Sequence, residues 1–251
     1  MIQSPQDIPW YHRWFGSDYL LLYQHRSVQE ARQTAAWLIE SLNLQPPCRV
    51  LDLACGPGRH AAEFARRGFE TVGLDLSWSL LSAARRLDAA KIVNRVRGDM
   101  RCLPLRGGNF NLALSLFTSF GYFQSAAEDA LVLREVHRVL GTGGIFVLDF
   151  LNATLVRREI IPQEEFTLGD IRVTILRWVD EGENRIKKLI RLCDADQERQ
   201  YLESVYLYGR KDLTDMFGQA GLSLQAEFGN YLGSPYSESS PRLIMIGRKS
   251  A

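Results

Sequence analysis

Two glycines that follow a short apolar run have the spacing needed to hold a ligand close to the backbone. The run is 49–54, with Asp52 inside it, and Gly56 and Gly58 follow one residue apart. Glycine has no Cβ, so the chain can turn sharply there and a ligand can approach it closely. The free N–H groups at the start of the next helix would then face that ligand. Strand, glycine turn and helix in this order indicate the opening of a nucleotide-binding βαβ unit.

Two further carboxylates follow at expected strand ends. Asp75 stands nineteen residues after Gly56. An acidic residue at about this separation accepts hydrogen bonds from ribose hydroxyls in nucleotide-binding folds. Asp99 follows the next short strand and precedes Met100. A turn aspartate often caps the local backbone, so a purely local role for Asp99 stays open.

The pattern Asp-x-x-x-Gly-x-Gly over 52–58 resembles the first motif of the class I S-adenosylmethionine (SAM) dependent methyltransferases. Ala61 stands where the dinucleotide pattern has its third glycine, and this argues against NAD. The order of elements agrees with the methyltransferase family strongly over 49–150 and in outline over 210–249. The resemblance includes small-molecule methyltransferases, the amino-sugar N-methyltransferases among them.

This resemblance implies a site for SAM and its product S-adenosylhomocysteine (SAH). Asp52 would lie beside the methionine end, Asp75 would bind the ribose, and Asp99 would accept the adenine amino group, with Met100 against the ring. The residues expected to contact the cofactor are Tyr11, Tyr19, Tyr23, Asp52, Ala54, Cys55, Gly56, Gly58, Asp75, Leu76, Asp99, Met100, Leu116 and Phe117.

The loop 116–123 after the fourth strand is expected beside the transferable methyl group. Thr118, Ser119 and Tyr122 are candidate contacts to the methyl acceptor, although aromatic residues of this loop could equally pack in the core. The loop lacks the Asn/Asp-Pro-Pro-Tyr/Phe signature of amino-methylating nucleic-acid enzymes, so that substrate class loses support.

No strong catalytic pattern is visible, and none is required. Displacement on a sulfonium methyl group needs alignment and exclusion of water more than a base. The candidates are Tyr122 and His12, which lies in an N-terminal aromatic cluster. His60 is interpreted as a polar residue on a helix face rather than a base, and His137 as a surface residue. Cys55 is interpreted as a small residue that fits the loop, not as a nucleophile.

The elements that must position these residues alternate regularly. We predict strands over 49–54, 70–75, 93–97, 109–116 and 145–150, and helices over 28–42, 59–67, 78–88 and 126–140. Such alternation favours parallel strands with right-handed crossovers. Ser77 can cap helix 78–88, because its hydroxyl can accept a first-turn N–H. In helix 126–140, the residues expected to point inward are Leu131, Leu133, Val136, Val139 and Leu140.

The pattern changes after residue 152. Alternating polar and apolar residues predict antiparallel strands over 171–179, 185–192 and 201–208, followed by a helix over 211–220 and strands over 222–228 and 243–248. The expected fold is α/β: a Rossmann-like seven-stranded sheet with helices on both faces and the last strand antiparallel, plus an antiparallel β insertion after the fifth strand. The expected division is an N-terminal helical lid segment (1–48), a SAM-binding domain (49–154 and 210–251) and the insertion (155–209).

Six aromatic residues lie within fourteen positions from Trp10 to Tyr23. A contiguous patch of large rings rarely stays in water, so this segment is expected to cover something. Tyr11, Tyr19 and Tyr23 are candidates to face the sulfonium, whose positive charge an aromatic ring stabilises. Core packing alone could explain some of these rings.

Charge and composition narrow the function classes. With 30 basic and 29 acidic residues the net charge is +1, so no global field attracts nucleic acid or an anionic membrane. Four cysteines without a Cys-x-x-Cys pair argue against a zinc site and against disulfides, and favour free thiols in a reducing cytoplasm. No apolar stretch is long enough to span a bilayer, and the N-terminus does not resemble a signal peptide.

The sequence therefore predicts a cytoplasmic SAM-dependent methyltransferase that acts on a small-molecule acceptor and needs no metal. Three alternatives stay open: a non-catalytic SAM-binding or regulatory protein, a methyltransferase of macromolecules, and an NAD-dependent oxidoreductase. The missing third glycine and the lack of a Tyr-x-x-x-Lys pair count against the last. The acceptor, its attacking atom and the oligomeric state are left undetermined.

Overall fold

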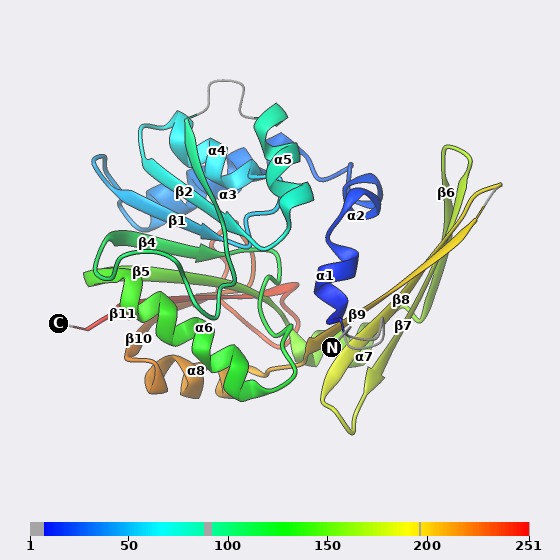
Figure 1. Ribbon diagram of the computed structural model, residues 1–251. Helices are drawn as coiled ribbons and strands as arrows, with labels where there is room; N and C mark the ends of the chain where they lie inside the picture. Colours follow the sequence, from blue (N-terminus) through cyan, green and yellow to red (C-terminus); the bar gives the residue numbers. More distant parts are fainter. Residues whose placement is uncertain (1–7, 88–91, 196, 251) are drawn as a thin grey trace, which may run out of the picture.

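A seven-stranded sheet forms the centre of the molecule (Figure 1), which a computed structural model describes over residues 8–87, 92–195 and 197–250. Its strand order is β10-β11-β5-β4-β1-β2-β3. The strands are β1 (Arg49–Leu53), β2 (Glu70–Asp75), β3 (Val93–Arg97), β4 (Phe110–Ser115), β5 (Leu140–Leu151), β10 (Leu222–Phe228) and β11 (Arg242–Lys249). The neighbouring pairs among β1 to β5 are parallel, and β11 is antiparallel to β5. The predicted seven-stranded sheet with an antiparallel last strand is confirmed.

Helices cover both faces of this sheet. Successive residues of a strand point to opposite faces, so Val50 packs in one apolar cluster and Leu51 in another. The first cluster includes residues of α3 (Val28–Ser41) and α4 (Arg59–Arg66), and the second includes residues of α6 (Ala126–Val139) and α8 (Arg210–Gln219). Helix α5 (Trp78–Leu87) begins after Ser77, whose Oγ accepts the N–H of Leu80 at 3.2 Å, as predicted.

One inward position of α6 was predicted wrongly. Leu131 is 38% exposed, whereas Val132 is fully buried beside Leu133. An α-helix has 3.6 residues per turn, so the buried face of α6 includes Val132, Val136 and Val139. Leu131 lies outside that face.

A second, four-stranded sheet extends to one side of the first (Figure 1). It consists of β6 (Gln163–Leu168), β7 (Ile171–Asp180), β8 (Arg185–Cys193) and β9 (Glu198–Tyr206), all antiparallel to their neighbours. The predicted antiparallel insertion after the fifth strand of the main sheet is therefore confirmed. Strand β6 and the short helix α7 (Ala153–Glu159) before it were not predicted, because β6 is mostly polar and exposed and α7 is only seven residues long.

Two short N-terminal helices lie between the sheets: α1 (Trp10–Trp14) and α2 (Ser17–Leu22) (Figure 1). Trp14 and Leu22 share an apolar cluster with Val173 and Ile190 of the second sheet. The indole N–H of Trp14 also donates to Glu203 of β9 at 2.5 Å. The aromatic segment is thus the packing layer between the second sheet and the body of the molecule. Of the helices in the described ranges, none has both the length and the apolarity to cross a bilayer.

Candidate functional site

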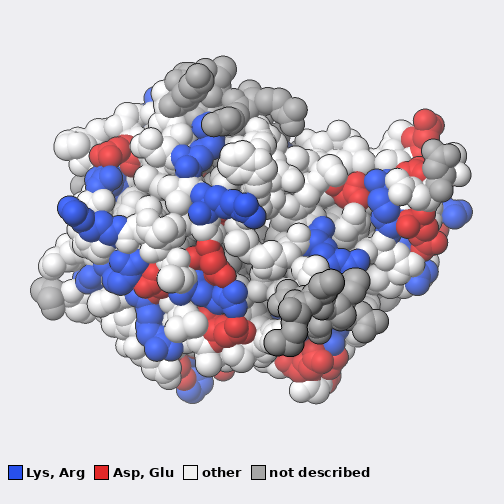
Figure 2. Space-filling model, in the orientation of Figure 1, with Lys and Arg blue, Asp and Glu red and all other residues white. Residues whose placement is uncertain are grey.

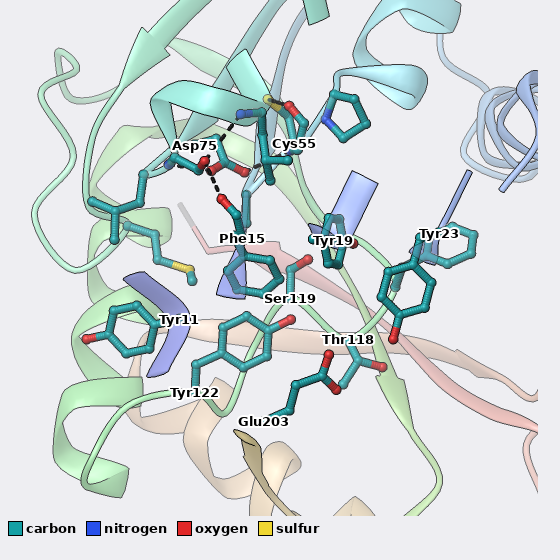
Figure 3. A pocket seen from close by; sticks show the side chains of 18 of the residues that line it. Tyr11, Phe15, Tyr19, Tyr23, Cys55, Asp75, Thr118, Ser119, Tyr122 and Glu203 are labelled. Carbon is teal, nitrogen blue, oxygen red and sulfur yellow. Dashed lines mark hydrogen bonds between the residues drawn. The ribbon is translucent and has the colours of Figure 1, made fainter. Parts of the chain in front are cut away.

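A cavity of about 720 Å³ opens at the carboxyl ends of β1 to β4. This volume lies within the usual range for small-molecule sites, about 300–1,000 Å³. The N-terminal aromatic segment and the inward face of the second sheet close its other sides. Figure 3 shows Asp75 and Cys55 on one side of the cavity and Glu203 on the opposite side. Carboxyl ends of parallel strands are where doubly wound folds bind ligands.

Almost every residue singled out from the sequence lines this cavity. The lining includes all the expected cofactor contacts except Gly58, and it includes both catalytic candidates, His12 and Tyr122, together with Thr118 and Ser119. Gly58 lies immediately before α4 and has φ 75°. A side chain there would be strained and would contact Ala84 at 3.4 Å, so Gly58 shapes the turn without lining the cavity.

Asp75 ends β2 and is held by the glycine turn. Its Oδ2 accepts the N–H of Gly56 at 2.8 Å, and its Oδ1 accepts the N–H of Ser77 at 2.7 Å. A carboxylate has about four acceptor sites, so each oxygen can still accept a ligand hydroxyl. The side chain is therefore fixed in position with acceptor capacity to spare.

Asp52 is the more deeply buried of the two carboxyls. It is 2% exposed, and its Oδ2 accepts the N–H of Ala61 at 3.1 Å. Burial raises the pKa of Asp52 to about 7, because the charged form loses its hydration. A cationic ligand group beside it would favour the ionised form.

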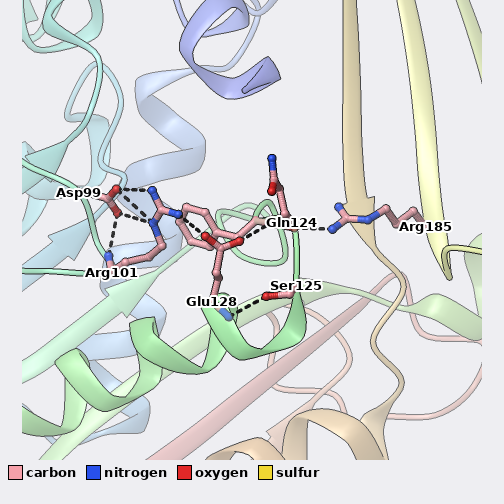
Figure 4. A network of polar contacts seen from close by, with 7 residues as sticks. Asp99, Arg101, Gln124, Ser125, Glu128 and Arg185 are labelled. Atoms are coloured by element: carbon pink, nitrogen blue, oxygen red, sulfur yellow. Dashed lines mark hydrogen bonds and ion pairs between the residues drawn. The ribbon is translucent and has the colours of Figure 1, made fainter. Parts of the chain in front are cut away.

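Asp99 caps the local backbone, and it also lines the cavity. Its carboxylate accepts from the guanidinium of Arg101 at 3.1 and 2.7 Å and from the Arg101 backbone N–H at 2.8 Å. Arg101 also donates to Glu128 at 2.6 Å, which links Asp99 to the start of α6 (Figure 4). Burial alone would raise the pKa of Asp99, but the hydrogen bonds from Arg101 outweigh it and hold the pKa below its ordinary value.

His60, interpreted above as a polar residue on a helix face, is a buried residue of α4. It is 6% exposed, and its Nε2 has no partner among the described residues. Burial lowers the pKa of His60 to about 3, and the charge of Arg59 lowers it further, so the ring is neutral near pH 7. Its ring lies 5.0 Å from that of Phe117. Helix α4 is buried from His60 to Phe64, and Arg59 and His60 at its start line the cavity.

Arg26 was missed by sequence reasoning. Its guanidinium lies 4.0 Å from the ring centre of Tyr23 and donates to the hydroxyl of Tyr19 at 2.8 Å. No carboxylate of the described residues lies within ion-pair distance of it. Its charge also acts on His60, next to the glycine turn. A single arginine in a loop belongs to no recognisable sequence motif. Its place in the cavity lining becomes visible only in the folded structure.

The loop after β4 has an unusual backbone. Phe117 and Thr118 have φ angles of 57° and 63°, a conformation that residues other than glycine rarely adopt. Asp149 of β5 holds both: its Oδ2 accepts the N–H of Phe117 at 2.7 Å, and its backbone carbonyl accepts the N–H of Thr118 at 3.0 Å. Arg242 donates to Asp149 at 2.6 Å and to the hydroxyl of Thr118 at 2.8 Å.

The second sheet supplies the wall opposite the strand ends. The residues of β7, β8 and β9 that line the cavity are Arg177, Ile186, Lys188, Glu203 and Val205. Glu203 lies 3.4 Å from the ammonium of Lys188.

Tyr122, one of the two catalytic candidates, also lines the cavity, and burial raises its pKa well above the ordinary value, so its hydroxyl stays protonated. His12 lines the cavity beside Tyr11, with the ring centres 5.0 Å apart.

Comparison with known proteins shows which proteins this chain resembles. Residues 50–144 match the family described as a methyltransferase domain. The putative methyltransferase YqeM of Bacillus subtilis is 29% identical over 243 residues, 94% of this chain and 96% of that protein. The dTDP-3-amino-3,4,6-trideoxy-alpha-D-glucopyranose N,N-dimethyltransferase of Streptomyces venezuelae is 33% identical over 122 residues, 44% of this chain and 50% of that protein. The chain thus spans nearly all of the first relative and half of the second.

A solved structure shares the fold. SAM-bound CalS10, an amino pentose methyltransferase from Micromonospora echinaspora, has a TM-score of 0.70 and 22% identity over 93% of this chain and 97% of that one. The domain match, the full-length relative and the order of strands in the sheet all agree with the glycine motif. They also agree with the strand-end carboxylates that line the cavity. The domain match and the full-length relative show a SAM-dependent methyltransferase, with SAM as the methyl donor, and the solved structure shows the shared fold.

Proposed function

We propose that this enzyme methylates a small-molecule acceptor inside the cavity between the strand ends and the second sheet. One observation carries the proposal: a single cavity is lined both by the residues expected to contact SAM and by a separate polar wall from β7, β8 and β9. The names of the amino-sugar relatives support a small acceptor. In this proposal residues 49–154 and 210–251 bind SAM, 155–209 form the acceptor wall, and 1–48 carry the lid.

SAM would extend across the carboxyl ends of β1, β2 and β3, where the strand-end residues can contact it. Asp75 would bind the ribose hydroxyls with its remaining lone pairs, and Asp99 with Met100 would hold the adenine. The turn from Ala54 to Gly58 and the carboxyl of Asp52 would hold the methionine end. Arg26, with no described carboxylate beside it, would pair with the carboxylate of that end. Leu76, Leu116 and Phe117 would pack against the remaining atoms of SAM.

When bound, SAM supplies an electrophilic methyl group on a sulfonium. The residues of this chain then need to align the acceptor and exclude water, which together account for several kcal/mol of a barrier. The rings of Tyr11, Tyr19 and Tyr23 would face the positive charge. Thr118, Ser119 and Tyr122 would orient the acceptor with their hydroxyls. His12 is proposed as the base only for an acceptor that must lose a proton, whereas Tyr122, whose hydroxyl stays protonated, would donate a hydrogen bond to the acceptor.

A nucleic-acid acceptor has less support. On the face shown in Figure 2, basic and acidic residues are interspersed, whereas a nucleic-acid surface gathers basic residues into a patch or stripe. We also propose a cytoplasmic location, which the four free cysteines support.

The test has two stages. Calorimetry should give saturable binding of SAM and SAH and much weaker binding of NAD. A metabolite library incubated with methyl-labelled SAM should then give label in a small molecule. Binding of NAD without SAM, or label only in protein or nucleic acid, would contradict the proposal.

A further inference from the structure

Cations from three strands line the part of the cavity that the proposed SAM contacts leave open. They are Arg177 of β7, Lys188 of β8 and Arg242 of β11. Their side chains are 23%, 14% and 27% exposed, so each is largely withdrawn from bulk water. The acidic residues of the cavity lining lie elsewhere, at the ends of β1, β2 and β3, with the exception of Glu203.

Two of these cations are fixed by carboxylates that do not line the cavity. Arg177 donates to Glu164 at 2.7 Å, and Arg242 donates through Nε to Asp149 at 2.6 Å. Arg242 uses one further N–H for Thr118, so three of its five N–H groups have no acceptor among the described residues. An arginine held this way keeps its orientation and still presents donors to a ligand.

The charges on this side are not balanced within the cavity. Burial lowers the pKa of Lys188, and the neighbouring charges of Arg177 and Arg26 lower it further, against the opposing effect of Glu203. Arg177 and Lys188 are also direct cross-strand neighbours on β7 and β8, so their positive groups lie near each other. The sulfonium of bound SAM would add to the same field. In a water-poor cavity such repulsion is relieved best by an anion.

We propose that the methyl acceptor carries an oxyanion, a carboxylate or a phosphate, which binds Arg177, Lys188 and Arg242. This inference rests on the proposed function and adds the chemical class of the acceptor. Arginine forks pair with both oxyanions through two parallel hydrogen bonds, and a lysine adds a point charge. The oxyanion serves to anchor the acceptor, and the atom that receives the methyl group is a different one.

The strands of the second sheet provide matched controls. Lys187 precedes Lys188 on β8 and points to the other face, where it pairs with Asp180 at 2.7 Å and Glu183 at 2.8 Å. Arg172 lies on β7 with Arg177, but it is exposed and outside the cavity lining. Lys188 and Arg177 can therefore each be compared with a residue of the same type on the same strand.

The experiment uses the full chain saturated with SAH, titrated with inorganic pyrophosphate and, separately, with malonate. At least one anion should bind the wild type, Lys187→Met and Arg172→Gln equally, and binding to Lys188→Met and Arg177→Gln should be at least about tenfold weaker, as expected on losing a charged hydrogen bond. Binding of pyrophosphate alone indicates a phosphate, and binding of malonate alone indicates a carboxylate.

Three results would overturn the inference: no binding of either anion, equal binding by the wild type and both cavity variants, or a library acceptor without negative charge. SAH affinity, measured in the same samples, distinguishes failure of the oxyanion inference from failure of the proposed function. If SAH binds and the anions do not, only the oxyanion inference fails; if SAH does not bind, the proposed function fails. Since Lys188→Met leaves Glu203 without its cation, Arg177→Gln keeps the test valid should that variant not fold.

Discussion

The carboxylate of Asp149 accepts the backbone N–H of Phe117 at 2.7 Å across the gap between β5 and the loop after β4. The same carboxylate accepts from the hydroxyl of Tyr231 at 2.7 Å and from Arg242 at 2.6 Å, and Asp149 is fully buried. Left-handed residues other than glycine cost about 1–3 kcal/mol each, so the turn at Phe117 and Thr118 persists only because its surroundings hold it.

Asp149→Asn should therefore loosen this turn. The amide cannot balance the charge of Arg242, and stranding one partner of a buried pair costs up to about 3–5 kcal/mol of unfolding free energy. Denaturant titration measures this loss, and hydrogen exchange at Phe117 and Thr118 should become faster. Tyr231→Phe, which removes a single hydrogen bond, should cost only about 1 kcal/mol. Equal stability of Asp149→Asn and the wild type would show that the turn does not depend on this carboxylate.

The sequence predicted the strand-end residues but not the Asp149 contacts, for a physical reason. Asp52 and Asp75 lie in runs whose apolar pattern and glycine turn are local, so neighbouring residues predict their place. Asp149 acts through residues 32, 82 and 93 positions away, and such pairings leave no trace in a local pattern. Arg26 was missed for the same reason, and so was the burial of His60, whose ring lies 5.0 Å from that of Phe117, 57 positions later in the sequence.

Asp75→Ala should weaken SAH binding by about 1–3 kcal/mol, the usual cost of an unsatisfied polar partner. The loss should nearly disappear for the 2′,3′-dideoxy analogue of SAH, which has no ribose hydroxyl to lose. Calorimetry with both ligands makes the comparison, and Asp170→Ala, at the turn between β6 and β7, serves as the control. A folded variant with unchanged SAH affinity would exclude Asp75 as the ribose ligand.

SAH affinity should depend on pH through Asp52. In the free enzyme the pKa of this carboxyl is raised from 3.8 to about 7, so below pH 7 it is mostly protonated. An ammonium group bound beside it favours the ionised form, and binding must then release a proton. Affinity should fall as the pH drops through about 7, by no more than about tenfold per pH unit.

Calorimetry at pH 6 in two buffers of different ionisation enthalpy should detect about one released proton, and almost none at pH 8. Asp52→Asn should abolish the difference. His60 does not interfere, because its pKa of about 3 keeps it neutral throughout. A pH-independent affinity in the wild type would place the ligand's ammonium away from Asp52.

Arg26→Met should weaken SAM binding by about 1.5–3 kcal/mol, the range for a hydrogen bond to a charged group. Decarboxylated SAM should bind both proteins alike, because it lacks the group that Arg26 is proposed to hold. Arg32→Met is a suitable control, since that side chain is 67% exposed and lies 3.7 Å from Glu63. An equal loss for both ligands would mean that Arg26 acts only by packing on Tyr23.

The lid proposal is best tested on the intact chain. Deletion of residues 1–24 would expose the apolar cluster around Val173 and Ile190, so loss of activity would not be specific. Hydrogen exchange should instead show that SAH protects residues 10–24, because Phe15 lines the cavity and its carbonyl accepts from Ser77 at 2.6 Å. Exchange in this segment that is unchanged by SAH would make it a packing element only.

The contact between Trp14 and Glu203 also has a consequence for the order in which the molecule assembles. These residues are 189 positions apart, so α1 meets this partner only after β9, the last strand of the second sheet, has been synthesised. Loop closure over such a distance is slow, and apolar segments without partners are prone to aggregate meanwhile. The central strands can pair before that strand is made, and the cavity is closed only late in synthesis. A ligand that contacts every wall of the cavity therefore binds only after synthesis has reached β11, whose Arg242 is the lining residue latest in the sequence.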